Sequence, residues 1–213
     1  MKSIKSIIAL GFGACLMACS PSTRITGSWT APSAAGKVNS GNTIFVASMT
    51  RNIEARTKIE SAFAAEAGAR NIKAVKSSDY FSPDFYQKLP SEQQMMGKIK
   101  GSGANLILTA SLINRESETR YVPGAGGYMP FSNFGWYGGF YSYYSFWGPR
   151  FYDPGYYVTD KTYFLETNIY DLATRKLIWS AQSETVNPGS LDNFAKTYPK
   201  VLIAQLIKDG VLR

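Results

Sequence analysis

Apolar positions in the first part of the chain alternate between strand-like and helix-like spacing. Residues Thr43–Met49 form a short β-branched and aromatic run, which is typical of a buried strand. A helix is expected next, capped by Thr50 or Asn52, because apolar residues share one helical face from Ile53 to Ala67 and a glycine follows. Residues 72–75 then predict a second strand.

The same order continues in the middle of the chain. Ser91 begins a second predicted helix, in which Met95, Met96 and Ile99 are apolar and two glycines mark the end. Residues 104–110 predict a third strand, so the first half reads β-α-β-α-β.

The carboxyl-terminal part predicts a hairpin and a helix. Residues 162–171 and 176–185 both alternate in the strand period, and residues 171–175 join them as a turn. Apolar residues spaced four apart from Phe194 to Leu206 predict a terminal helix, which Pro199 starts or kinks. The fold class is therefore α/β: a single mixed-sheet domain of two or three layers over residues 43–213, in the order β-α-β-α-β, insertion, β-β-α.

The amino terminus has the features of a secretion signal. Lys2 and Lys5 precede an uncharged apolar run that is too short to span a bilayer stably, so residues 1–18 are expected to be removed. Residues 16–19 resemble the bacterial lipobox, with Leu16 three residues before Cys19, whereas Cys15 is a poorer acceptor. The alternatives are a plain signal peptide or a buried amino-terminal helix.

An acylated Cys19, carrying chains such as palmitate, would anchor the mature protein without a membrane-spanning segment. Because Ser20, and not aspartate, follows the cysteine, the periplasmic face of the outer membrane is favoured over the inner membrane or the cell surface. Residues 19–42 are rich in small and polar residues and are expected to form a flexible tether.

Composition narrows the chemistry that the chain can perform. The sequence has no histidine and two cysteines, one of which lies in the predicted signal, so zinc sites, His-dependent triads and an internal disulfide are not expected. The formal net charge is +8, with the basic residues scattered. In the envelope this charge favours a solvated surface, or lipid and polymer anions, and no nucleic acid is expected as a partner.

Residues 121–158 form an insertion unlike the rest of the chain. Sixteen of its 38 residues are Tyr, Phe or Trp, eight are Gly, and only Arg150 and Asp153 are charged. It is expected to be a low-complexity loop, a strand extension whose rings pack, or a contact surface for a protein partner or self-assembly, a membrane or a glycan, in that order of preference among contacts. The candidate contact residues are Tyr121, Tyr128, Trp136, Tyr137, Tyr141, Tyr143, Tyr144, Trp147, Tyr156 and Tyr157.

No catalytic arrangement is apparent in the sequence. Glu116 and Glu118, or Glu54 and Glu60, are pairs of carboxylates, but solvated faces account for them. The glycines of residues 124–127 lack the preceding strand and following helix of a phosphate-binding loop. We therefore expect a protein that is not an enzyme and that needs no cofactor or metal.

Several of these segments together resemble a known type of protein. The lipobox at Cys19, the strand and helix from Ile44 to Ala67, the strand at residues 104–108, and the hairpin with Asp171 and Trp179 resemble uncharacterised Gram-negative outer-membrane lipoproteins. Their fold is similar to that of the curli-secretion lipoprotein, the penicillin-binding-protein activator lipoproteins and the TolB amino-terminal domain. The resemblance implies no catalytic residue, and the membrane hairpins of the curli-type channel have no counterpart here.

The sequence as a whole predicts a lipid-anchored, non-enzymatic binding or assembly factor of the cell envelope with a protein partner. The alternatives are an oligomeric structural or pore-forming envelope component and a cell-wall hydrolase.

Overall fold

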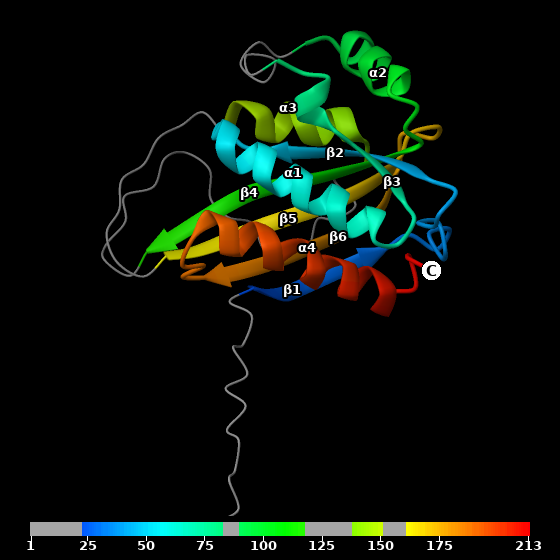
Figure 1. Ribbon diagram of the computed structural model, residues 1–213. Helices are drawn as coiled ribbons and strands as arrows, with labels where there is room; N and C mark the ends of the chain where they lie inside the picture. The colour runs from blue at the N-terminus through cyan, green and yellow to red at the C-terminus, as the bar shows by residue number, and fades with distance from the viewer. Residues whose placement is uncertain (1–22, 83–89, 118–137, 151–160) are drawn as a thin grey trace, which may run out of the picture.

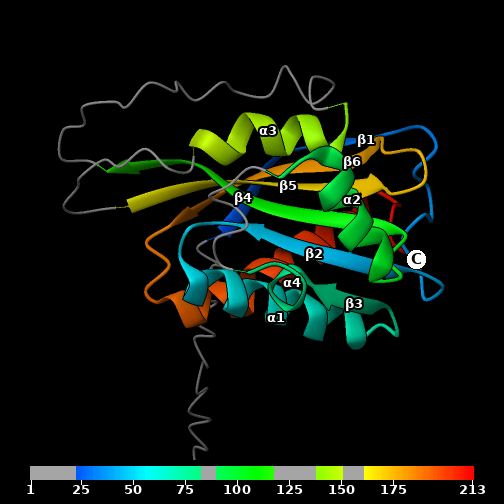
Figure 2. The same cartoon turned by 90° about the horizontal axis from the view of Figure 1, so that it is seen from above.

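A mixed β-sheet lies at the centre of the structure, with helices on both of its faces (Figure 1, Figure 2). The computed structural model describes residues 23–82, 90–117, 138–150 and 161–213, without the side chains of residues 117 and 146–150. Its strands are β1 (Thr23–Thr30), β2 (Thr43–Met49), β3 (Lys73–Lys76), β4 (Leu106–Ser117), β5 (Lys161–Asp171) and β6 (Leu177–Val186). Its helices are α1 (Ile53–Gly68), η1 (Ser77–Asp79), α2 (Glu92–Gly101), α3 (Phe140–Arg150) and α4 (Leu191–Lys208).

The six strands follow the order β1-β6-β5-β4-β2-β3 across the sheet. Strand β2 is parallel to both of its neighbours, and the pairs β4–β5, β5–β6 and β6–β1 are antiparallel. The predicted fold class, one mixed α/β domain, is confirmed.

Local capping explains where two helices begin. The Asn52 side chain accepts a hydrogen bond of 3.0 Å from the backbone N–H of Ala55, which satisfies one free donor at the start of α1. Ser91 and Gln94 form a reciprocal capping box at the start of α2. Both starts agree with the sequence pattern.

The first face of the sheet is apolar and is covered by α1 and α4. Ile59 and Phe63 of α1 and Tyr198 and Leu202 of α4 pack there against the strands. Trp179 is fully buried in this layer, and its indole N–H donates to the Asp209 carboxylate at the end of α4, at 2.9 Å. Strand β6 is thereby joined to the carboxyl-terminal helix.

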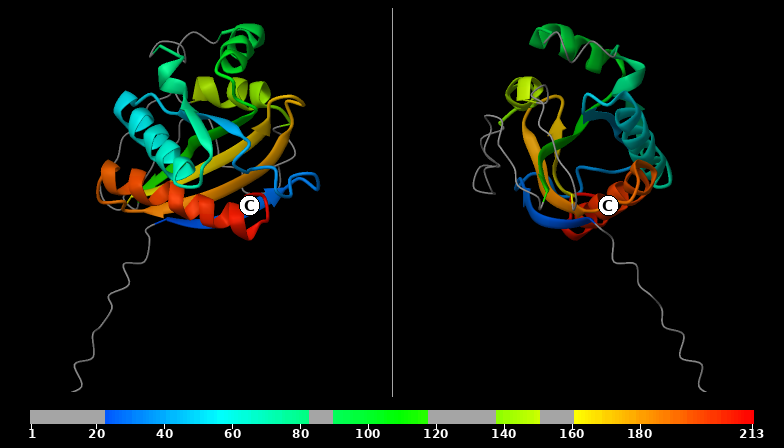
Figure 3. Two further views of the ribbon diagram at one scale, coloured as in Figure 1. Left: turned by 45° about the vertical axis from the view of Figure 1, so that its right-hand side comes forward. Right: turned by 90° about the vertical axis from the view of Figure 1, so that its left-hand side faces the viewer.

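The second face is covered by α2 and α3, as an edge-on view shows (Figure 3). Met95, Met96 and Ile99 of α2 are buried beside Phe45 of β2, and Phe140 of α3 packs in the same cluster. Since helices cover both faces, the domain has three layers.

The predicted boundary of the tether is wrong. Residues 23–30, expected to be flexible, form the edge strand β1, which pairs with β6 from Thr23↔Thr185 onward. Ala34 and Val38 are buried against the same core, so residues 23–42 belong to the domain. The strand contains a glycine and several polar residues, so its sequence has only a weak preference for β-structure. Its pairing with β6 outweighs this weak preference.

The structure corrects two further predictions. Residues 140–150 of the insertion form the helix α3, although the sequence predicted a loop or a strand there. Pro199 lies inside α4 and is buried, so it does not start this helix, which begins at Leu191.

Candidate functional site

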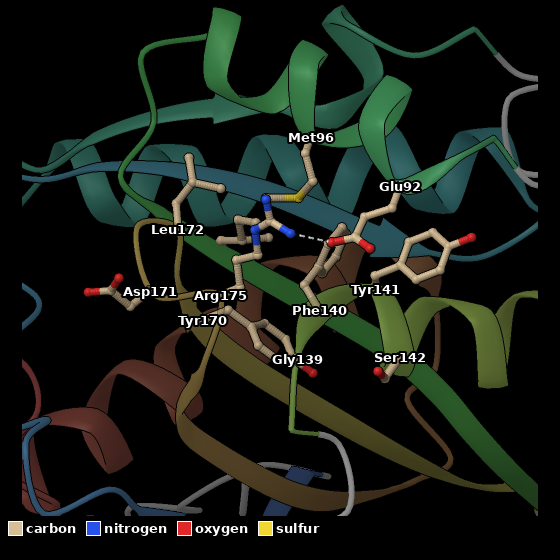
Figure 4. Close-up of a pocket in the computed structure, with 11 residues that line it drawn as sticks. Glu92, Met96, Gly139, Phe140, Tyr141, Ser142, Tyr170, Asp171, Leu172 and Arg175 are labelled. Carbon is tan, nitrogen blue, oxygen red and sulfur yellow. Dashed lines mark hydrogen bonds and ion pairs between the residues drawn. The ribbon is translucent and has the colours of Figure 1, made fainter.

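A pocket opens between α2, the first turn of α3 and the turn of the β5–β6 hairpin (Figure 4). Its volume is about 120 Å³. The segments that form it are far apart in the sequence, and the fold brings them together at one end of the second sheet face.

The floor of the pocket is apolar and aromatic. Met96 of α2, Ile107 of β4, Phe140 of α3, and Tyr170 and Leu172 of the hairpin line it, and all five side chains are buried. The Phe140 and Tyr170 rings meet edge to face, with 5.8 Å between their centroids. Packed rings in this geometry give the floor a fixed shape.

The rim of the pocket is charged. Glu92 at the start of α2 and Arg175 at the hairpin turn form an ion pair with 2.6 Å between Oε1 and Nη1, and both side chains are largely exposed (Figure 4). An exposed pair of this kind contributes only about 0–1 kcal/mol to stability. The pair can therefore open for a ligand at little energetic cost.

The hairpin turn holds Arg175 in place through backbone geometry. The Asp171 carboxylate accepts a hydrogen bond of 2.8 Å from the backbone N–H of Thr174, and this bond lowers the pKa of Asp171 below its ordinary value. Lys37 lies 3.8 Å from the same carboxylate. Arg175 has a φ of 59°, a left-handed conformation that is uncommon for a residue with a side chain. The turn thus directs Arg175 toward α2.

The size of the pocket limits what it can receive. Small-molecule and cofactor sites usually enclose about 300–1,000 Å³, so this pocket suits one large side chain. A shallower hollow of about 550 Å³ continues from it along α2, sharing Glu92, Met96 and Arg175. A side-chain pocket with an apolar floor that opens into a hollow fits a docked protein segment with one anchor residue.

The candidate contact residues divide into three groups. Tyr141 lines the pocket, half-buried at the start of α3. Tyr143 and Tyr144 are buried in the cluster on the second face of the sheet, so these two rings pack in the core, as one of the alternatives predicted. Trp147 is on α3, but its side chain is outside the described residues. Cys19, Tyr121, Tyr128, Trp136, Tyr137, Tyr156 and Tyr157 also lie outside them.

The sheet face beneath α3 carries buried polar side chains in two cross-strand rows. One row pairs Ser111 with Glu166 and Glu166 with Gln182, and the other pairs Thr109 with Asn168 and Asn168 with Ser180. All six side chains are buried. In the described part of the chain, the hydroxyls of Thr109, Ser111 and Ser180 have no hydrogen-bond partner. Such a face holds a helix less firmly than an apolar face does.

Glu166 is the acidic centre of these polar rows. The Asn168 and Gln182 amides each donate to its carboxyl group at 3.0 Å. Burial raises the pKa of Glu166 above its ordinary value, although hydrogen bonds from Asn168, Gln182 and Tyr143 oppose the rise. The sequence placed Glu166 on one side of an alternating strand but did not show that a helix covers that side.

A second buried carboxylate, Glu60, connects α1 to two other elements. It accepts hydrogen bonds from the backbone N–H groups of Ser48 at 3.0 Å and Ser78 at 2.9 Å, and from the Ser77 hydroxyl at 2.6 Å. Arg56 lies 3.7 Å away and is also buried. The expectation that a solvated face accounts for Glu60 is therefore wrong, because this side chain has no exposed surface.

The described residues hold neither a cluster of metal-ligating side chains nor a helix able to span a membrane. Across residues 23–82, 90–117, 138–150 and 161–213, no group of three or more His, Cys, Asp or Glu side chains could hold a metal ion. Within the same ranges, no helix combines the length and the apolar character needed to cross a membrane.

Comparisons with known proteins gave weak structural matches. No protein-family model matches the sequence, and no curated protein matches it. A PelC dodecamer from Paraburkholderia phytofirmans has a TM-score of 0.43 at 14% identity, covering 84% of this chain and 94% of that one. A second PelC dodecamer structure from this organism has a TM-score of 0.42 at 15% identity, covering 89% and 96%. Lipoprotein GNA1162 from Neisseria meningitidis has a TM-score of 0.39 at 10% identity, covering 78% and 99%. Similarity this weak transfers no function to this chain.

Proposed function

We propose that the protein is a non-enzymatic binding or assembly factor of the cell envelope, anchored by acyl chains on Cys19 to the periplasmic face of the outer membrane. Its partner is a protein segment that docks in the pocket between α2, α3 and the hairpin. The single observation that carries the binding function is this pocket, with its buried aromatic floor and its exposed Glu92–Arg175 rim.

The chemistry of the pocket supports a protein partner. Protein interfaces concentrate their binding energy in a few anchor side chains that fill desolvated pockets, surrounded by contacts of little net energy. Met96, Phe140 and Tyr170 provide such a desolvated floor. Glu92 and Arg175 provide charges of both signs that a partner can pair with, which gives specificity and register.

The proposed location rests on the sequence. The apolar run before Cys19, the Leu16 position and Ser20 after the cysteine together favour a lipid-anchored protein at the outer membrane. The family resemblance of the hairpin around Asp171 and Trp179 points to the same class of lipoprotein.

Site-specific photo-crosslinking in intact envelopes tests the docking site. A photoreactive phenylalanine analogue at Tyr141 is expected to capture one defined envelope protein. Replacing the whole of residues 121–158 would be a poor test, because it would remove α3 and uncover the second sheet face. A point change is better: Ser142→Arg places a long side chain at the mouth of the pocket and should reduce the adduct at least several-fold, because Ser142 is exposed there.

Two controls make the crosslinking specific. Ala65→Arg adds the same side chain on the outer face of α1 and should leave the adduct unchanged. The photoreactive residue at Ile207, an exposed position on α4, should not give this adduct. Adducts that are the same from Tyr141 and Ile207, or that persist in Ser142→Arg, would contradict docking at the pocket. A crosslink between two copies of the chain would instead support the oligomeric alternative.

A further inference from the structure

We infer that the domain meets the membrane with one end of its sheet, the end that carries Thr23, Val186 and Lys161. This orientation rests on the proposed acylation of Cys19. The partner surface is the anionic phospholipid head groups of the membrane that holds the anchor.

The connection between the proposed anchor and the domain is short. Strand β1 begins at Thr23, so only residues 20–22 separate it from Cys19. Four residue steps of fully extended chain span at most about 14 Å. Strand β4, with 12 residues, is about 40 Å long. The connection is therefore much shorter than the sheet, and it keeps the end of the sheet that carries Thr23 within about 14 Å of the anchor.

Strand pairing shows which residues lie beside Thr23. Thr23 pairs with Thr185, and the next residue, Val186, pairs with Thr162. Lys161 and Asn187 exchange hydrogen bonds of 2.9 Å beside them. The end defined by these residues is the one at which β1 begins and β6 ends (Figure 1). The insertion also departs from this end, because Ser117 pairs with Lys161.

The exposed side chains at this end suit a lipid surface. Val186 is 42% exposed and Ile53, at the start of α1, is 56% exposed, although both are large and apolar. An ion pair joins Lys58, in the second turn of α1, to Asp192, in the first turn of α4. Both helices begin at this end and direct their positive dipole ends the same way (Figure 1). Val186 lies next to Lys161 across the β5–β6 pair, and an apolar group beside a basic side chain is typical of surfaces that bind anionic head groups.

The opposite corner of the sheet provides a matched reference. Lys73 is the first residue of β3, the edge strand farthest from β1 in the sheet order, and it is exposed. It pairs with Thr43 at the start of β2, at the other end of the strands. With the Thr23 end on the membrane, Lys73 lies at the end of the strands that faces away from it.

Fluorescence quenching by lipids tests the orientation in the acylated full chain. No described residue is a cysteine, so Val186→Cys and Lys73→Cys each add one thiol for an environment-sensitive dye. In vesicles of phosphatidylethanolamine and phosphatidylglycerol with a head-group quencher, the dye at position 186 is expected to be quenched several-fold more than the dye at position 73. Both variants change exposed residues, and circular dichroism checks that each is folded.

The possible results test the acylation of Cys19 and the orientation of the domain separately. Mass spectrometry of the same samples first shows whether Cys19 carries acyl chains, and an unmodified Cys19 overturns the anchor and the orientation together. Acylated protein with equal quenching at both positions, or stronger quenching at position 73, overturns the orientation alone. Position-186 quenching that is lost in phosphatidylcholine vesicles would confirm a preference for anionic head groups, and quenching that persists there would contradict it.

Discussion

Replacing Glu60 with alanine is expected to lower the free energy of unfolding by about 3–5 kcal/mol. The change removes the acceptor of three buried hydrogen bonds, two of which come from backbone N–H groups of Ser48 and Ser78. It also removes the carboxylate nearest to the buried guanidinium of Arg56, which keeps its hydrogen bond to the Phe81 carbonyl. A buried donor or charge that loses its partner retains the full cost of desolvation, which is why the loss is large.

Denaturant unfolding monitored by tryptophan fluorescence measures this effect. Glu66→Ala is the matched control, because it removes a carboxylate from the same helix whose partners Arg70 and Lys200 are solvent-accessible. The control is expected to lose less than about 1 kcal/mol. Equal losses for Glu60→Ala and Glu66→Ala would show that Glu60 does not hold β2 and η1 against α1.

Replacing Glu166 with glutamine is expected to remove a loss of stability at high pH. Because burial raises the pKa of Glu166 in the folded state, the native protein binds this proton more tightly than the unfolded chain does. Stability from this group is therefore complete below the ordinary pKa of 4.5 and declines as pH rises through the raised value. Glu166→Gln cannot ionise, so its stability should not fall with pH in this way, and it should gain stability relative to the wild type as pH rises.

The pH series needs an exposed carboxyl group of the same sheet as its control. Glu116→Gln removes such a charge from β4 and should leave the decline with pH intact. Unfolding between about pH 4 and pH 8 provides the comparison. A wild-type stability that rises over this range, or an equal decline in Glu166→Gln, would contradict a raised pKa for Glu166 in the folded state.

Much of the fold could be predicted because the signals are local. The Asn52 cap, the Ser91 capping box and the turn after Asp171 depend on residues within a few positions of one another, and each lies where the sequence indicated. The strand at Thr43–Met49 has the predicted bounds.

The missed elements depend on distant partners. Strand β1 has a polar sequence and forms because β6 pairs with it, beginning with Thr23 and Thr185, which are 162 residues apart. Helix α3 is aromatic and contains Gly148 and Pro149, a composition that disfavours a helix in isolation, and Phe140, Tyr143 and Tyr144 gain their stability by packing on the sheet.

The candidate site could be predicted only in part for the same reason. The aromatic content of the insertion drew attention to Tyr141, which lines the pocket. The sequence did not indicate that Glu92 and Arg175 belong to a site, because they are 83 residues apart and meet only in the folded chain. The burial of Glu60 and Glu166 was also invisible, since each is covered by elements distant in sequence.

Mass spectrometry of the amino-terminal peptide from protein purified out of membranes tests the central claim most directly. We predict that residues 1–18 are absent, that the chain begins at Cys19, and that acyl chains account for the added mass. Cys19→Ser, which retains Cys15, should give no acylated peptide and should release the protein from the membrane fraction. An unmodified Cys19, or acylation that persists at Cys15 in this variant, would contradict lipid anchoring at Cys19.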